Sequence, residues 1–299
     1  MHSYEQQGKK KTTHVRELDG VDELIGFMQH AREQEYISGL AGASLYDESG
    51  EYKPWSGSRT MEEAIEVARF GWEEGCKYLQ QRIGEIAVDQ LIGDRTVVNQ
   101  RYQLAGDEVD IDRYLIGEPE QMIEYYTEPE RNGKHVTILA NIGVPATVQP
   151  QQIMRRGGAM YAAMEALRSS GYSTGLSVAT AVKTKHDRIE YHVPIVQPGE
   201  YLNIDTAAFC LAHPSFLRRG IFAAGEHEPV DLRERMNFID GRGYGSPSKI
   251  KTELPPSTVL IDKEEGLDLE TPVEVQRFAQ HIIDRALQAI SSEDLPSLS

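Results

Sequence analysis

The sequence has few of the features that mark a secreted or membrane-spanning protein. Only two cysteines, Cys76 and Cys210, occur in 299 residues, and they do not have metal-binding spacing. No apolar run reaches the roughly 18 residues that a transmembrane helix needs. The first 13 residues contain three lysines but no apolar stretch after them, so they do not form a secretory signal. We expect a reduced, intracellular protein.

Basic residues are scarce relative to acidic ones. Lys and Arg number 31 whereas Asp and Glu number 47, which gives a net charge of −16. A chain this acidic repels nucleic acid and anionic membrane surfaces, so we expect it to bind neither by itself. The hydrophobic fraction of 39% and the charged fraction of 26% are those of an ordinary globular protein.

The common catalytic and cofactor motifs are missing as well. The sequence has no G-x-G-x-x-G or Walker loop for a nucleotide and no G-x-S-x-G for a serine hydrolase. It has neither H-E-x-x-H nor C-x-x-C, the short spacings that bind zinc. We therefore assign no catalytic residue, no cofactor and no metal ligand.

Local patterns predict four parts of the chain. Residues 1–15 are polar and indicate a mobile tail, and residues 16–133 form a mainly helical N-terminal region. In that region Thr60 and Glu63 form a capping box at the start of a helix, and the helical pattern continues to about Gly93. Residues 134–290 form an α/β domain, and residues 291–299 are a polar tail.

The α/β domain begins with an apolar, β-branched strand over 136–142 and a helix that Pro150 opens. Strands over 174–182 and 189–195 follow. Because only about six residues connect them, they form an antiparallel hairpin rather than a parallel crossover. A strand over 257–261 and a helix that Thr271 caps complete the domain. The fold class is α/β, with an open, mostly parallel sheet, one antiparallel edge strand and helices on both faces.

This order of elements resembles the von Willebrand factor A fold, whose third strand is the antiparallel edge. Metal-binding members of that family carry Asp-x-Ser-x-Ser at the end of the first strand, where oxygen ligands suit a hard cation. Here the corresponding positions are Asn141, Gly143 and Pro145. The resemblance implies a degenerate von Willebrand A-like domain that has lost the metal-ion-dependent adhesion site.

A fainter resemblance concerns four short pieces of sequence. They are Trp55-Ser-Gly, Gly71-Trp72, the segment from Tyr114 to Pro119, and the segment from His213 to Arg219. The pieces are similar to those of an uncharacterised group of tailed-bacteriophage proteins. This implies a phage-encoded protein in the host cytoplasm or associated with the virion, and it implies nothing about mechanism.

Five residues are candidates for contacts with a partner. Arg155 and Arg156 lie early in the first helix of the α/β domain, near the sheet edge where open α/β folds bind ligands. Arg218, Arg219 and Trp55 are the others. The alternatives are a solvated pair for Arg155 and Arg156, helix-end stabilisation for Arg218 and Arg219, and a core position for Trp55.

Two further groups of residues could form a chemical site, or they could have an ordinary structural role. His213, Glu226, His227 and Glu228 have the side chains of a metal or acid–base site, but their spacing fits no known signature and also suits helix-end contacts. The acidic run over 107–112 lacks the glycine and distal Glu of an EF-hand and indicates a solvated face.

The sequence therefore favours a non-catalytic protein–protein interaction module. Its partner would be a phage virion, replication or transcription component, or a host protein. The alternative is a metal-dependent, hydrolytic enzyme that uses His213, Glu226, His227 and Glu228.

Overall fold

The computed structural model describes residues 1–8, 11–33, 53–85, 96–129, 134–238, 244 and 246–293. The predicted end of a helix at Gly93 and the predicted boundary after residue 133 lie outside these residues. Of the predicted tail over 291–299, residues 291–293 belong to the last helix, and the rest lies outside the description as well.

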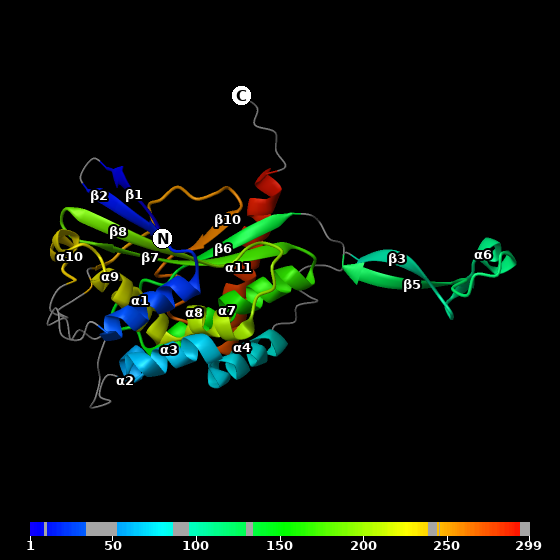
Figure 1. Ribbon diagram of the computed structural model, residues 1–299, viewed down its shortest axis with the longest axis horizontal. Helices are drawn as coiled ribbons and strands as arrows, with labels where there is room; N and C mark the ends of the chain where they lie inside the picture. The colour runs from blue at the N-terminus through cyan, green and yellow to red at the C-terminus, as the bar shows by residue number, and fades with distance from the viewer. Residues whose placement is uncertain are drawn as a thin grey trace, which may run out of the picture.

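A seven-stranded sheet forms the body of the protein (Figure 1). Its strands are β1 (His2–Gln7), β2 (Thr12–Glu17), β6 (His135–Asn141), β7 (Ser173–Lys183), β8 (Asp187–Val196), β9 (Ser246–Pro247) and β10 (Thr258–Ile261). The order is β1-β2-β8-β7-β6-β10, and β9 pairs with the end of β7. β10, β6 and β7 run parallel, and β7 and β8 form the predicted antiparallel hairpin. The sheet is therefore mostly parallel at its centre, as expected.

The N-terminus differs from its prediction. Residues 1–15 are not a mobile tail, because β1 and β2 form a hairpin and β2 pairs in parallel with β8. β8 is consequently an inner strand, and β1 is the edge. The buried side chains of β2 include His14 and Arg16, which bind Asp187 and Glu228. These partners lie more than 170 residues away in the sequence, so no local pattern could predict the pairing.

The helices that contact the sheet share one core on one of its faces. They are α1 (Val21–Glu33), α7 (Pro150–Ser169), α8 (Ile204–Ala212), α10 (Val230–Met236) and α11 (Pro272–Glu293). Ile138 of β6 points into this core, which also contains the inner sides of α7 and α11. On the opposite face Leu139 packs against Ile250 and Leu254, from the connection that crosses above the sheet (Figure 1). The predicted helices on both faces are therefore wrong for the part of the chain that the structure describes.

A second layer of helices covers α7 and α8. It contains α3 (Met61–Phe70) and α4 (Glu73–Glu85), after the short α2 (Lys53–Ser56). Thr60 caps α3 as predicted, because its side chain accepts a hydrogen bond from the Glu63 amide. The Glu63 carboxylate binds the amide of Arg59. Leu79 of α4 belongs to the same hydrophobic core as the sheet, so these helices pack directly on the α/β body.

The helix after α8 has an unusual start. Pro214 ends α8 at Ala212, as its missing amide predicts. The chain then forms a π-helix over Phe216–Ile221, which leads into α9 (Phe222–Glu226). Arg218 and Arg219 belong to this segment, and both are buried.

Residues 96–129 form an arm that projects from the body (Figure 1). The arm contains β3 (Thr96–Gln103), β4 (Glu108–Val109), α6 (Ile111–Leu115) and β5 (Met122–Pro129), with the strand order β3-β5-β4. α6 lies at its far end. This part of the predicted mainly helical region is therefore largely β-structure. No residue from 100 to 126 is buried, so this stretch has no hydrophobic core of its own.

Candidate functional site

The carboxyl edge of the sheet, where open α/β folds bind ligands, is closed by Arg156 of α7. Its Nη2 donates to the carbonyl oxygens of Asn141 at 3.0 Å and Asp262 at 2.9 Å, and its Nε donates to that of Glu265 at 2.7 Å. The residue is 3% exposed. Arg156 therefore bridges the ends of β6 and β10 and is no surface contact, so its predicted partner role is wrong.

Electrostatics at this edge disfavour a bound cation. Burial lowers the pKa of Arg156 to about 10, so the guanidinium stays charged at neutral pH. The Asn141 amide is occupied as well: its Nδ2 donates to the Ser248 carbonyl at 3.0 Å, and its Oδ1 accepts from the Gly143 amide at 3.1 Å. The residues present do not fit a metal ion at this position.

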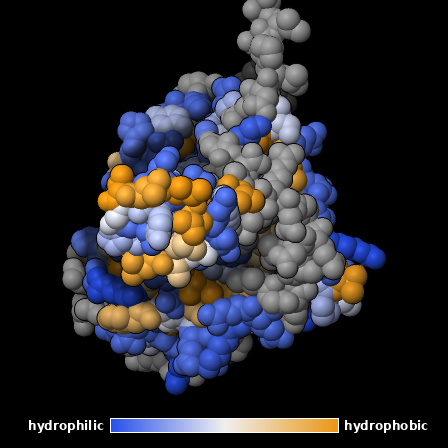
Figure 2. Space-filling model, turned by 90° about the vertical axis from the view of Figure 1, so that its right-hand side faces the viewer, coloured by the Kyte–Doolittle hydropathy of each residue, from blue (hydrophilic) through white to orange (hydrophobic). Residues whose placement is uncertain are grey.

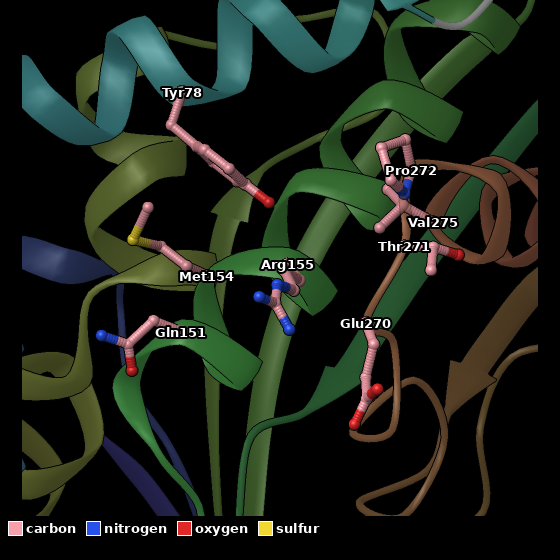
Figure 3. Close-up of a pocket in the computed structure, with 8 residues that line it drawn as sticks. All are labelled: Tyr78, Gln151, Met154, Arg155, Glu270, Thr271, Pro272 and Val275. Carbon is pink, nitrogen blue, oxygen red and sulfur yellow. The ribbon is translucent and has the colours of Figure 1, made fainter.

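Arg155 lines a cavity of about 290 Å³ between α4, α7 and the start of α11 (Figure 3). Its guanidinium donates to the Leu269 carbonyl at 3.1 Å. Figure 3 shows Tyr78 reaching from α4 towards Arg155, whereas the Glu270 carboxylate turns away. The nearby N-terminus of α11 already has an anion, because Glu274 accepts from the amides of Glu270 and Thr271. These bonds lower the pKa of Glu274, so a carboxylate of the protein itself already lies at this helix end.

Arg218 and Arg219 are structural rather than partner-binding. They are 1% and 0% exposed. Arg218 donates to the carbonyl oxygens of Trp55 and Val148, and its guanidinium lies 4.6 Å from the centre of the Trp55 ring. Arg219 donates to the carbonyl of Ser58 at 3.2 Å. The two arginines tie the chain before α3 to the body, and this corrects their predicted role.

Trp55 is only half-buried, but it also has a structural partner. Its Nε1 donates to the carbonyl of Ala146 at 3.0 Å, and its ring lies 6.3 Å from that of Phe222. Trp55 therefore anchors the segment before α3 on the α/β body. Of the five predicted contact residues, the structure leaves only Arg155 and Trp55 partly accessible.

The residues of the predicted alternative enzyme do not converge. His213, Glu226, His227 and Glu228 each bind different partners. These are Ser215 and Trp72 for His213, Tyr244 for Glu226, Ala223 for His227, and Arg16 with Tyr191 for Glu228. Within the described ranges no group of three or more His, Cys, Asp or Glu side chains could hold a metal ion. Among the described residues, these four side chains therefore do not form a metal site.

The helix-free face of the sheet carries a second cavity, of about 600 Å³. Strand side chains such as Thr137, Ser177 and His192 line it, together with the segment from Thr252 to Thr258. His192 lies 3.5 Å from Glu190, and Glu190 also accepts hydrogen bonds from the amides of Lys251 and Thr252. The Glu190 carboxylate thus holds the covering segment on the sheet.

The arm tip, residues 104–121, exposes an unusual amount of apolar surface. Eight of the 13 exposed large apolar side chains in the described structure belong to the arm. Leu104, Ile111, Leu115 and Ile116 are the most exposed of them, and Leu115 is 73% exposed. Apolar side chains gather on the side of the molecule from which the arm projects (Figure 2). Clustering of this kind marks interaction sites, whereas singly scattered apolar residues do not.

Polar contacts hold the tip in shape. Asp110 caps α6 by accepting from the amides of Asp112 and Arg113, both at 3.1 Å, and these bonds lower the pKa of Asp110. The Arg113 guanidinium lies 3.7 Å from the centre of the Tyr102 ring and pairs with Glu118 at 2.8 Å. These polar contacts hold the tip in shape while its large apolar side chains face the solvent.

The tip is also strongly acidic. Residues 104–121 contain six carboxylates and one arginine, which gives a net charge of −5 in 18 residues. Asp107, Glu108 and Asp112 are exposed, which confirms the predicted solvated face over 107–112. Sequence analysis identified this acidic run but missed the apolar surface beside it, although the unbroken Tyr114-Leu115-Ile116 triplet next to a turn was a usable signal.

Comparison with known proteins gives a family but no function. The DUF7192 family, described as a domain of unknown function, matches residues 6–272. The matched range includes the β8–β2 part of the sheet, the arm and the carboxyl edge. No curated protein and no solved structure matches the chain. Among the residues that the structure describes, no helix is long and apolar enough to cross a membrane.

Proposed function

The chain belongs to the DUF7192 family, and we propose that it is a non-catalytic protein that binds another protein through the tip of its arm. One observation carries this proposal: the tip is fixed in shape by Asp110 and Arg113, yet it exposes Ile111, Leu115 and Ile116. Exposing such side chains to water is unfavourable by about 25 cal/mol per Å² of apolar surface. Burial against a partner would remove that surface from water.

The body supports a binding role in a different way. The strand order, with β7 between β6 and the antiparallel β8 and with β10 on the other side of β6, matches a von Willebrand A-like domain, but the described helices that contact the sheet cover one face instead of two. At the position of that family's metal site, Arg156 and Asn141 make internal hydrogen bonds. A domain of this kind without its metal site would act as a scaffold for the arm. A phage origin and a location in the host cytoplasm or virion remain proposals that rest on the short sequence resemblances.

Site-specific photo-crosslinking tests the proposed function. A photoreactive residue is placed at Leu115 in the full-length protein and, as a matched control, at Tyr201, which is 83% exposed on the body. Both proteins are irradiated in cells that contain the natural partners. We expect one dominant crosslinked protein from position 115 and none from position 201. Equal products from both positions, or none from position 115, would refute a docking role for the tip.

A further inference from the structure

We infer that the partner presents an apolar surface bordered by lysine or arginine side chains; this inference rests on the proposed function of the arm tip. The apolar cluster around Leu115 lies among carboxylates, and the one cation of the tip is already used. Arg113 stacks on Tyr102 and pairs with Glu118. Every charge that the tip offers to an approaching surface is therefore negative.

Two carboxylates are available for such a partner. Asp112 and Glu120 are exposed, and among the described residues their carboxylates have no hydrogen bond or ion pair. Other acidic side chains already accept hydrogen bonds within the arm. Asp107 accepts from the Tyr125 amide, and Glu108 accepts from the Tyr125 hydroxyl. Asp112 and Glu120 thus form an acidic rim beside the apolar surface, and complementary charges would steer a basic partner to it.

The same charges exclude other occupants of the tip. A second copy of the chain also has a net charge of −16, so its approach would be repelled. Nucleic acid and anionic lipid carry the same sign and would be repelled as well. A protein surface with an apolar centre and a basic rim is the class that satisfies both features of the tip.

The construction of the arm gives an independent reason for an occupant. A small sheet that projects into water without a hydrophobic core is marginally stable, and no residue from 100 to 126 is buried. Docking would supply the missing burial.

Two synthetic amphipathic helical peptides serve as probes for this chemistry. They share the same leucine face, but one carries lysine on its polar face and the other carries glutamate. Binding to the full-length protein is measured by fluorescence anisotropy at about 50 mM and about 150 mM salt, where the screening length shortens to roughly 8 Å. We expect the lysine peptide to bind at least ~10-fold more tightly than the glutamate peptide and to weaken several-fold with salt.

Three double variants locate the binding. Leu115→Ser with Ile116→Ser removes the apolar centre and should abolish binding of the lysine peptide. Asp112→Asn with Glu120→Gln removes the rim and should weaken binding about fivefold at low salt. The control Glu66→Gln with Asp268→Asn makes the same change in net charge at exposed body positions and should leave binding unchanged.

The outcomes separate the two proposals. If both peptides bind equally and without salt dependence, but Leu115→Ser with Ile116→Ser still abolishes binding, the basic-rim inference is wrong and the docking role stands. If the body control weakens binding as much as the rim variant, the inference is also wrong, because net charge alone then explains the preference. If the apolar variant binds the lysine peptide normally, the proposed function fails as well.

Discussion

Replacement of Arg156 by methionine tests whether this arginine holds the carboxyl edge of the sheet together. Methionine keeps most of the length and apolar volume of the side chain but removes every donor. The carbonyl oxygens of Asn141, Asp262 and Glu265 then lose their hydrogen bonds from Arg156. These carbonyls come from β6 and from the residues after β10, so the variant should loosen the contact between the two strand ends.

Two opposing contributions set the magnitude. Hydrogen bonds from a charged donor contribute about 1.5–3 kcal/mol each, so three of them give roughly 5–9 kcal/mol. Burial of the charge opposes this: it lowers the pKa of Arg156 to about 10, which corresponds to roughly 3 kcal/mol against the charged form. The hydrogen bonds therefore win, and we expect Arg156→Met to lower the free energy of unfolding by about 4 kcal/mol.

Urea unfolding at pH 7, followed by circular dichroism, measures this loss, and Arg155→Met is the matched control. Arg155 is the neighbouring residue of α7 and is half-buried, and within the described residues its guanidinium makes one hydrogen bond, to the Leu269 carbonyl. We expect the control to lose about 1 kcal/mol or less. If Arg156→Met loses no more than Arg155→Met while the urea dependence is unchanged, Arg156 does not stabilise the edge and the reasoning is refuted.

Four further predictions concern the core, metal, nucleic acid and pH. Ile138→Ala should lower the free energy of unfolding by about 2–5 kcal/mol, because Ile138 is fully buried on the helix face of β6; an unchanged urea midpoint would contradict its central position. Millimolar Mg²⁺ should not raise the melting temperature, because the Asn141 side chain donates to the Ser248 carbonyl and the Arg156 guanidinium donates to the Asn141 carbonyl. A rise of several degrees in a thermal scan would reveal a metal site. DNA should not shift in a gel with micromolar protein at about 150 mM salt, and a retarded band would contradict the charge argument. Burial raises the pKa of Cys76 to about 12 and raises that of Tyr191. The unfolded chain releases these protons at lower pH than the folded one, so the free energy of unfolding should fall as the pH rises above about 8.5; equal urea midpoints at pH 7 and pH 10 would contradict this.

Local signals determined much of the α/β body. The β7–β8 hairpin follows from its short connection, α7 begins at Pro150, and α11 begins after Thr271, where Glu274 completes the cap. Alternating apolar residues and helix caps act within a few residues, so a single sequence is enough to reveal them. The acidic run over 107–112 was likewise correctly predicted to be exposed.

The roles of the arginines depend on contacts between residues that lie far apart in the sequence, and local patterns do not reveal such contacts. Arg156 was predicted to bind a partner because it lies early in the helix after the first strand, near the sheet edge where open α/β folds bind ligands. Arg218 and Arg219 were further candidates. The fold instead surrounds them with backbone carbonyls, from Asn141 and Asp262 in one case and from Ser58 in another. A guanidinium with five donors can be buried where such carbonyls converge, and that convergence exists only in three dimensions.

The N-terminal hairpin and the arm also show which features follow from the sequence and which follow only from the tertiary structure. The sequence by itself determined the acidity of the chain, the missing catalytic motifs and the local elements of the body, because each depends on residue type or on short spacing. Only the tertiary structure decided that residues 12–17 pair with β8 and that the Tyr114-Leu115-Ile116 triplet lies at the end of a projecting arm rather than in a core. An apolar triplet has the same local pattern in either place, and whether water or protein surrounds it depends on the path of the whole chain.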